Sequence, residues 1–169
     1  GGVDATGISE TTLANEFAFK GGAYPGVGGT CGDPINANCT IVITYSPGTV
    51  ALHAETVTLQ YNDGVAVQTA ARALQGTGAA PATLSISDGP TYDYGTVATG
   101  TNYDYTFTVT YAGGVDATGI SETTLANEFD FKGGAYPGTG GTCGDPINAN
   151  CTIVITYSPL AIGAHAETV

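Results

Sequence analysis

The sequence predicts an all-β chain built from tandem β-sandwich domains in a 112-residue repeat. Three observations carry this prediction. In several short stretches apolar and polar residues alternate with a period of two, as in half-buried strands. Turn-forming Gly, Pro, Asn and Asp separate these stretches, and no segment has the pattern of an amphipathic helix. Finally, a long segment of the sequence occurs twice.

The repeated segment is residues 1–57, which recur as residues 113–169. The copies differ only at Ala18/Asp130, at Val27/Thr139 and at positions 48–52 against 160–164. A shared fold would tolerate far wider substitution, so the near-identity indicates recent duplication within an array. A period of 112 residues is too long for a solenoid unit and has the size of one independent domain.

The small residues and proline of 76–81 are typical of a linker between domains. We therefore expect one repeat over residues 1–81, without its first strands, and another over residues 82–169, without its last. Such unfinished sheets would be completed by a longer polypeptide of which this chain is a window, or by other copies joined head to tail.

Strand signals occur in both the repeated and the unrepeated segments. Phe17 and Phe19 alternate within 12–20, a stretch that also resembles a helical turn. Alternation over 40–45 ends at Ser46-Pro47.

A strand over 51–61, the turn 62–64 and a return over 65–74 predict a β-hairpin. The alanines of 65–74 weaken the strand pattern, but its valines and threonine and the preceding turn favour a strand. Leu84 and Ile86 form a shorter strand, and Tyr103–Tyr111 alternates throughout.

The composition limits the classes of partner. The chain has three basic and fifteen acidic residues, which gives a net charge of −12. Nucleic acids and anionic membrane surfaces require the opposite charge, so neither is expected. Hydrophobic residues make up 42% of the chain, which is enough to form a core. No apolar run is long enough to span a bilayer.

The four cysteines form two pairs, Cys31/Cys39 and Cys143/Cys151, each in the motif C-G-D-P-I-N-A-N-C. The turn-forming residues between them can bring the ends of the loop to disulfide distance. The spacing is not that of a C-x-x-C redox or zinc motif, so we expect one disulfide within each repeat. Disulfides would indicate an oxidising, extracellular compartment, whereas buried free thiols would indicate the cytosol.

The order of the motifs resembles that of a known family. T-L-S-I-S-D, Y-D-Y-G-T-V-A-T-G-T and Y-T-F-T-V-T-Y-A-G-G precede C-T-I-V-I-T-Y-S-P, L-H-A-E-T-V-T-L-Q-Y and A-L-Q-G-T-G. This order is similar to that of bacterial choice-of-anchor D and Hydin-type (ASH) immunoglobulin-like repeats. The chain departs from the family where Tyr111-Ala112-Gly113 replaces an Asn-containing turn and where Tyr45 and Tyr157 replace Phe.

The resemblance implies an immunoglobulin-like sandwich of about seven strands. It also implies a strand that enters through Gly95-Thr96-Val97 and a bridge of the Cys31–Cys39 type. Family members serve as spacers or adhesive modules of secreted proteins, although a fold transfers better than a role.

The sequence contains no constellation of catalytic residues, so we expect no enzymatic activity. It has no G-x-S-x-G, P-loop or dinucleotide motif. Each repeat has one histidine, His53 or His165. His53 lies two residues from Glu55 in a predicted strand, where an acid–base or pH-sensing pair is one interpretation and a strand histidine without a chemical role is the other.

Three further sites remain open. Calcium is the one cofactor that the acids allow, with Asp63, Asp88, Asp93 and Asp104 as candidate ligands, but no D-x-D-x-D-G loop gathers them and no metal site is assigned. Lys20 and Lys132 are either exposed lysines or partners in an isopeptide bond. Asn38 and Asn150 fit the N-x-T glycosylation pattern, with a cysteine between the two key residues.

These observations predict a bacterial structural protein at the cell surface, in which neighbouring copies of the repeat join head to tail in a stalk or filament. One alternative is an adhesin module that binds glycan or protein through exposed Tyr24, Tyr92 or Tyr94. Another is an accessory domain of a secreted enzyme. Near-identical copies favour the spacer, because a binding site does not require such faithful duplication.

Overall fold

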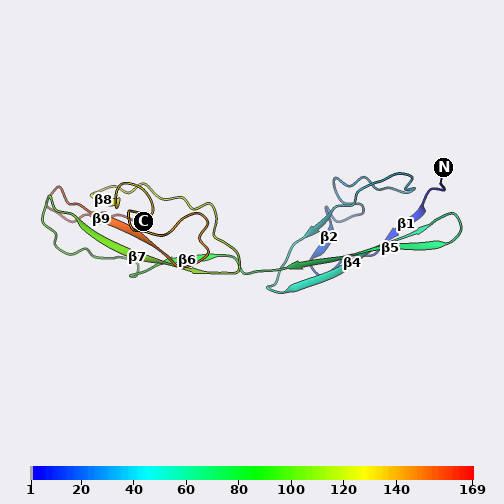
Figure 1. Cartoon of the computed structure of the whole chain (residues 1–169), viewed down its shortest axis with the longest axis horizontal. Helices are drawn as coiled ribbons and strands as arrows, with labels where there is room; N and C mark the ends of the chain where they lie inside the picture. The colour runs from blue at the N-terminus through cyan, green and yellow to red at the C-terminus, as the bar shows by residue number, and fades with distance from the viewer. Residues whose placement is uncertain (1) are drawn as a thin grey trace. The chain divides into compact units, whose positions relative to one another are not determined.

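The computed structural model describes residues 2–169, and in that range the chain is all-β, with nine strands and no helix. It divides into two compact units, residues 1–79 (unit 1) and 80–169 (unit 2) (Figure 1). The division falls in the expected linker. However, β5 (Val67–Thr77) extends over Gly76 and Thr77, so the linker is shorter than expected.

Unit 1 contains a three-stranded and a two-stranded sheet. β4 (Leu52–Asn62) and β5 pair along their whole length, which confirms the predicted hairpin. β1 (Thr6–Glu10) lies on the other edge of β4 and is not expected from the sequence, because it lacks an alternating pattern. β2 (Phe17–Phe19) and β3 (Ile43–Tyr45) form the two-stranded sheet. Both are shorter than the strand signals over 12–20 and 40–45.

Side chains fix the turn of the β4–β5 hairpin. Asp63 Oδ1 accepts hydrogen bonds from the backbone N–H groups of Val65 and Ala66, both at 2.8 Å. Asn62 Oδ1 accepts one from Gly64 N–H, also at 2.8 Å. The backbone bonds to Asp63 lower the pKa of its carboxyl. Asn and Asp at these positions therefore define where β4 ends and β5 begins.

Unit 2 contains one four-stranded antiparallel sheet with the order β6-β7-β9-β8. Its strands are β6 (Thr83–Ile86), β7 (Tyr103–Ala112), β8 (Phe129–Phe131) and β9 (Cys151–Tyr157). The predicted strands at Leu84–Ile86 and Tyr103–Tyr111 are confirmed. The strand expected through Gly95-Thr96-Val97 is wrong, since these residues have no regular secondary structure.

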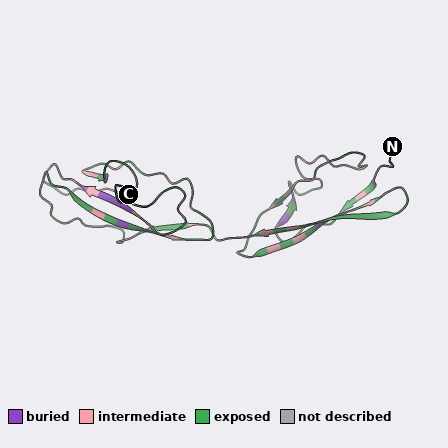
Figure 2. Cartoon of the chain, viewed as in Figure 1, coloured by how far each residue is buried: buried purple, intermediate pink, exposed green. Residues whose placement is uncertain are grey.

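The core of unit 2 lies along the central strands β7 and β9 (Figure 2). Phe107 and Val109 are buried, while the alternating Thr106, Thr108 and Thr110 are exposed, as the pattern predicts. β9 contributes Ile153 and Ile155, each 2% exposed. The core is therefore formed mainly where β7 and β9 lie side by side.

The same sequence forms less strand in unit 1 than in unit 2. Residues 39–45 correspond to β9, yet only Ile43–Tyr45 is a strand, because residues 2–79 contain no counterpart of β7 beside it. Conversely, residues 118–122 correspond to β1 but form no strand. In unit 1 β1 pairs with Leu59, Gln60 and Asn62, whose counterparts do not occur in unit 2.

This difference predicts unequal effects of one substitution at two equivalent positions. Ile155→Ala should destabilise unit 2 by about 2–5 kcal/mol, because it opens a cavity in a buried core. Ile43→Ala should cost clearly less in unit 1, since Ile43 is only partly buried. Urea unfolding followed by NMR signals of each unit measures both effects. Equal losses would contradict the assigned difference in packing.

Candidate assembly surfaces

The two copies of the repeated segment make the same local contacts. Corresponding aromatic rings stack at centroid distances of 4.8 Å (Phe17–Tyr45) and 4.7 Å (Phe129–Tyr157). The carboxylates of Asp33 and Asp145 accept hydrogen bonds from Gly7 N–H at 3.0 Å and Gly119 N–H at 3.1 Å, respectively. Both partners of each contact lie inside the duplicated segment, so these contacts form with either set of neighbours.

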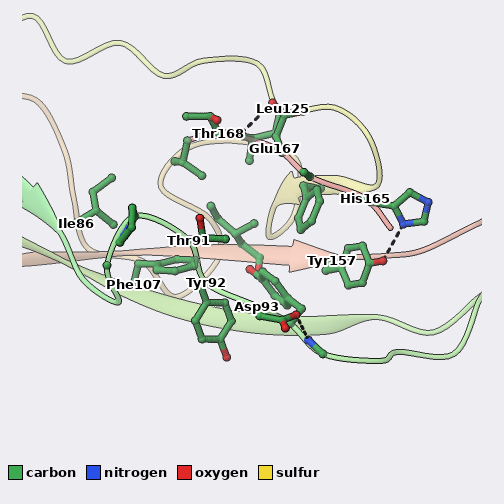
Figure 3. Close-up of a pocket in the computed structure, with 18 of the residues that line it drawn as sticks. Ile86, Thr91, Tyr92, Asp93, Phe107, Leu125, Tyr157, His165, Glu167 and Thr168 are labelled. Carbon is green, nitrogen blue, oxygen red and sulfur yellow. Dashed lines mark hydrogen bonds between the residues drawn. The ribbon is translucent and has the colours of Figure 1, made fainter. Parts of the chain in front are cut away.

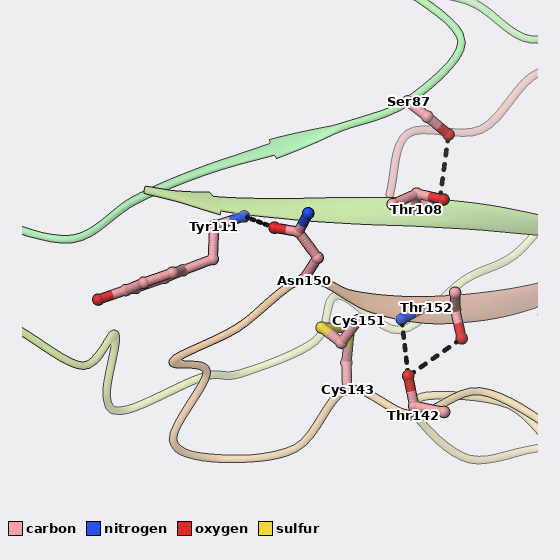
Figure 4. The surroundings of a disulfide bond; sticks show 8 residues. All are labelled: Ser87, Thr108, Tyr111, Thr142, Cys143, Asn150, Cys151 and Thr152. Carbon is pink, nitrogen blue, oxygen red and sulfur yellow. Dashed lines mark hydrogen bonds between the residues drawn. A yellow bond between two sulfur atoms is a disulfide. The ribbon is translucent and has the colours of Figure 1, made fainter. Parts of the chain in front are cut away.

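The disulfide loops belong to this common structure. Cys31 is bonded to Cys39 and Cys143 to Cys151, and no cysteine in the described chain is free. Figure 4 shows that Thr142 Oγ1 accepts a hydrogen bond from Thr152 N–H, at 3.0 Å, beside the second disulfide. The equivalent bond from Thr40 N–H to Thr30 Oγ1 is also 3.0 Å long. Each loop is thus closed both covalently and by hydrogen bonds.

β9 has a strand on both sides, whereas its counterpart in unit 1 has one. In unit 2, β7 pairs with β9 from Tyr103↔Tyr157 to Val109↔Cys151, and β8 pairs with the other side. In unit 1, β3 pairs with β2 alone, within the part of the chain that the structure describes. We call the side of residues 39–45 that faces away from β2 the acceptor edge. Its apolar residues Ile41, Val42 and Ile43 are partly exposed, whereas their counterparts on β9 are buried.

Side chains reinforce the pairing of β7 with its neighbours. Lys132 Nζ lies 2.9 Å from Asp104 Oδ2, and Thr156 Oγ1 donates to Asp104 Oδ1 at 2.7 Å. These two hydrogen bonds lower the pKa of the Asp104 carboxyl. At the far end of β7, Tyr111 N–H donates to Asn150 Oδ1 at 2.9 Å (Figure 4). Both ends of β7 are therefore held in register by polar contacts.

Tyr94, from the segment between β6 and β7, adds a contact inside unit 2. Its hydroxyl donates to Ile155 O at 3.2 Å, and its ring packs against Phe129 and Tyr157. Burial raises the pKa of this hydroxyl above its ordinary value, so it stays protonated and able to donate well above neutral pH. Tyr92 stacks on Tyr105 with ring centroids 3.8 Å apart. These tyrosines thus form part of the packing around β9.

Besides the acceptor edge of unit 1, the chain has an open cavity in unit 2, with a volume of about 670 Å³ (Figure 3). Ile86, Tyr92, Phe107, Phe129 and Tyr157 line it, together with the C-terminal residues from Gly163 to Val169. Most of these side chains are apolar or aromatic. The cavity therefore exposes one face of the core of unit 2.

In unit 1, the β4–β5 hairpin covers the corresponding face. Val57 is 3% exposed there, whereas its counterpart Val169 in unit 2 is 47% exposed. β5 passes so close to Tyr45 that a Cβ atom on Gly76 would lie 2.6 Å from the ring. Glycine is thus required at this point of the hairpin. The comparison shows that the hairpin lies against Tyr45 and buries Val57 in unit 1.

The histidines do not form the pair considered from the sequence. His53 Nδ1 is hydrogen-bonded to the Tyr45 hydroxyl at 2.8 Å, and His165 Nδ1 to that of Tyr157 at the same distance (Figure 3). Glu55 instead accepts a hydrogen bond from Asn15 Nδ2 at 3.3 Å. The interpretation of His53 and Glu55 as an acid–base pair is therefore wrong. His53 thus links β4 to β3, and His165 links the irregular C-terminal segment to β9.

The candidate calcium ligands lie in separate places. Asp63 closes the β4–β5 turn, Asp93 accepts from Gly95 N–H at 2.8 Å, and Asp104 pairs with Lys132. Asp88 is bonded to the neighbouring Ser87 hydroxyl. Among residues 2–169, no group of three or more His, Cys, Asp or Glu side chains is arranged to hold a metal ion.

Other candidate residues also have packing roles. Lys132 forms the ion pair with Asp104, while Lys20 is exposed. Asn150 is the acceptor for Tyr111 N–H. Tyr24, Tyr92 and Tyr94 were expected to be exposed, but this is wrong, because all three are partly buried among other aromatic rings. Their periodicity could not reveal this, since they lie in irregular segments.

Comparison with protein-family models, curated proteins and solved structures gives no match. In the described residues there is no helix of the length and apolarity that a membrane crossing needs.

The Asp104–Lys132 pair predicts a pH-dependent difference between two equivalent lysine variants. Lys132→Met should destabilise unit 2 by less than about 1 kcal/mol, because both partners are partly exposed. A lowered pKa means that folding favours the ionised carboxylate. Its contribution is therefore complete above the unfolded pKa of about 4 and is lost as the pH falls through the lower folded value.

Thermal unfolding between about pH 2 and pH 6 measures this effect. The wild type should lose its advantage over Lys132→Met toward the acid end of the range. Lys20→Met is the matched control and should have no effect at any pH, since Lys20 has no ion pair within residues 2–169. Equal effects of the two substitutions would show that the ion pair does not contribute.

Proposed function

We propose that the chain is an extracellular structural repeat protein, in which immunoglobulin-like sandwiches join head to tail in a stalk or filament at the cell surface. The observation that carries the proposal is the complementarity of the two units. Unit 2 has the four-stranded sheet but lacks the β4–β5 hairpin, and unit 1 has the hairpin but lacks β6 and β7. One complete period would contain both.

The strand order of such a period supports an immunoglobulin-like fold. In chain order its strands are A (β6), B (β7), C (β1), D (β2 or β8), E (β3 or β9), F (β4) and G (β5). The sheet β6-β7-β9-β8 is then A-B-E-D, and the sheet β1-β4-β5 is C-F-G. These are the two sheets of the constant-type immunoglobulin sandwich. The order agrees with the resemblance to choice-of-anchor D and ASH repeats.

Covalent and electrostatic features suit a position outside the cell. Each repeated segment has one disulfide, a bond that persists in oxidising compartments. Closing a loop of this length stabilises the fold by about 2–3 kcal/mol in the chain-entropy model. A net charge of −12 makes neighbouring fibres repel and remain soluble.

The structural role is also better supported than the adhesin alternative. That alternative depends on exposed aromatic residues, and the tyrosines concerned are packed against other rings. In the same way, the histidine of each copy is hydrogen-bonded to a tyrosine of its own unit. We accordingly propose no catalytic role for the chain.

Recombinant arrays of three and six consecutive periods test this function. If repeats are rigid spacers joined head to tail, electron microscopy should show fibres of constant width whose length doubles from three periods to six. An array with all cysteines replaced by serine is the control. It should unfold more easily but should keep the shape of the fibre. Compact particles whose width grows with the number of periods would contradict the proposal.

A further inference from the structure

The geometry points to the acceptor edge of unit 1 as the binding site for a strand with the sequence of β7, supplied by a neighbouring repeat. This inference rests on the proposed function, which places another repeat next to unit 1, and it specifies the segment, the register and the side chains of the contact. The expected occupant is residues 82–112 of that repeat, which contain both β6 and β7.

Unit 2 provides the template for the register. Its β9 has the same sequence as residues 39–45 and is paired with β7 in antiparallel orientation. Moving each β9 residue to its counterpart in unit 1 places Tyr103 opposite Tyr45, Phe107 opposite Ile41 and Val109 opposite Cys39. Phe107 and Val109 would then cover the apolar residues of the acceptor edge. A shift by one residue would turn these side chains to the solvent and is therefore excluded.

The polar contacts of β7 have their acceptors and donors in unit 1 as well. Asp104 would meet Lys20 and Thr44, as it meets Lys132 and Thr156 in unit 2. Tyr111 N–H would donate to Asn38 Oδ1, the counterpart of Asn150. Lys20 has no ion pair among residues 2–169, so its charge is available for the incoming carboxylate.

The β7 strand of the same chain cannot occupy the acceptor edge without leaving its place beside β9. β7 already has β6 on one side and β9 on the other. Leaving β9 would expose Ile153 and Ile155, which are each 2% exposed in the folded unit. The occupant is therefore a further copy of the segment, supplied by another repeat.

A lengthened chain tests the inference. Residues 82–112 are added before Gly1, so that the new Ala112–Gly1 junction repeats the natural Ala112–Gly113 junction. Amide exchange by NMR then compares residues 39–45 with residues 151–157. We expect exchange in 39–45 to slow at least about tenfold relative to the 169-residue chain, while protection of 151–157 is retained.

Two controls make the result specific. Phe107→Asp and Val109→Asp in the added segment alone should abolish the new protection, because the charges cannot be buried against the acceptor edge. Asp104→Lys in the added segment should weaken the protection, and Lys20→Asp should restore it by reversing the pair. Unchanged exchange in 39–45, or equal protection by the Phe107→Asp, Val109→Asp segment, would overturn the inference.

The result of this exchange experiment can be distinguished from the result of the array experiment that tests the proposed function. If exchange in 39–45 is unchanged while long arrays still form uniform fibres, the binding site is wrong and the spacer role stands. If the added segment protects the acceptor edge while arrays collapse into compact particles, the site stands and the spacer role is wrong.

Discussion

The structure depends on one constraint, the need of a β-strand for a neighbour that satisfies its backbone hydrogen bonds. The duplicated segment demonstrates this within a single molecule. Residues 151–157 form a continuous strand because β7 lies beside them, whereas only the last three of the identical residues 39–45 do so. Residues 6–10 form a strand against β4, whereas residues 118–122, without residues 58–62 beside them, do not. Local sequence is the same in each comparison, so the neighbouring segment decides the outcome.

The burial of side chains also depends on which segment lies beside them. Where β7 pairs with β9, Ile153 and Ile155 enter a core with Phe107 and Val109. Where the β4–β5 hairpin is present, Val57 is buried, and where it is absent, Val169 is half exposed and a cavity remains. The disulfides, the Asp–Gly contacts and the Tyr–His contacts are the same in both units, because both of their partners lie inside the duplicated segment. In the proposed head-to-tail assembly, the contacts inside the duplicated segment would form in every repeat, and the remaining contacts would depend on the neighbouring segment.

The sequence predicts the elements whose signal is local. Alternation identifies Tyr103–Tyr111, and Asn62-Asp63-Gly64 identifies the β4–β5 hairpin, since its turn is fixed by those side chains. The cysteine spacing likewise predicts the two disulfides that are present. β1 could not be found, because it is a strand only through its pairing with β4 and lacks an apolar alternation. The exposed tyrosines and the His53–Glu55 pair were wrong for a related reason: sequence distance does not reveal which side chains pack against Tyr45 or Phe107.

The central claim is that identical residues differ in stability according to the segment beside them. Amide hydrogen exchange of the unmodified chain tests it most directly. Fragments that extend through positions 48–52 or 160–164 distinguish the two copies, because the sequences differ there. The account predicts that amides of Ile41 and Ile43 exchange faster than those of Ile153 and Ile155, while the amides within the two disulfide loops exchange alike. Equal exchange along 39–45 and 151–157 would contradict it.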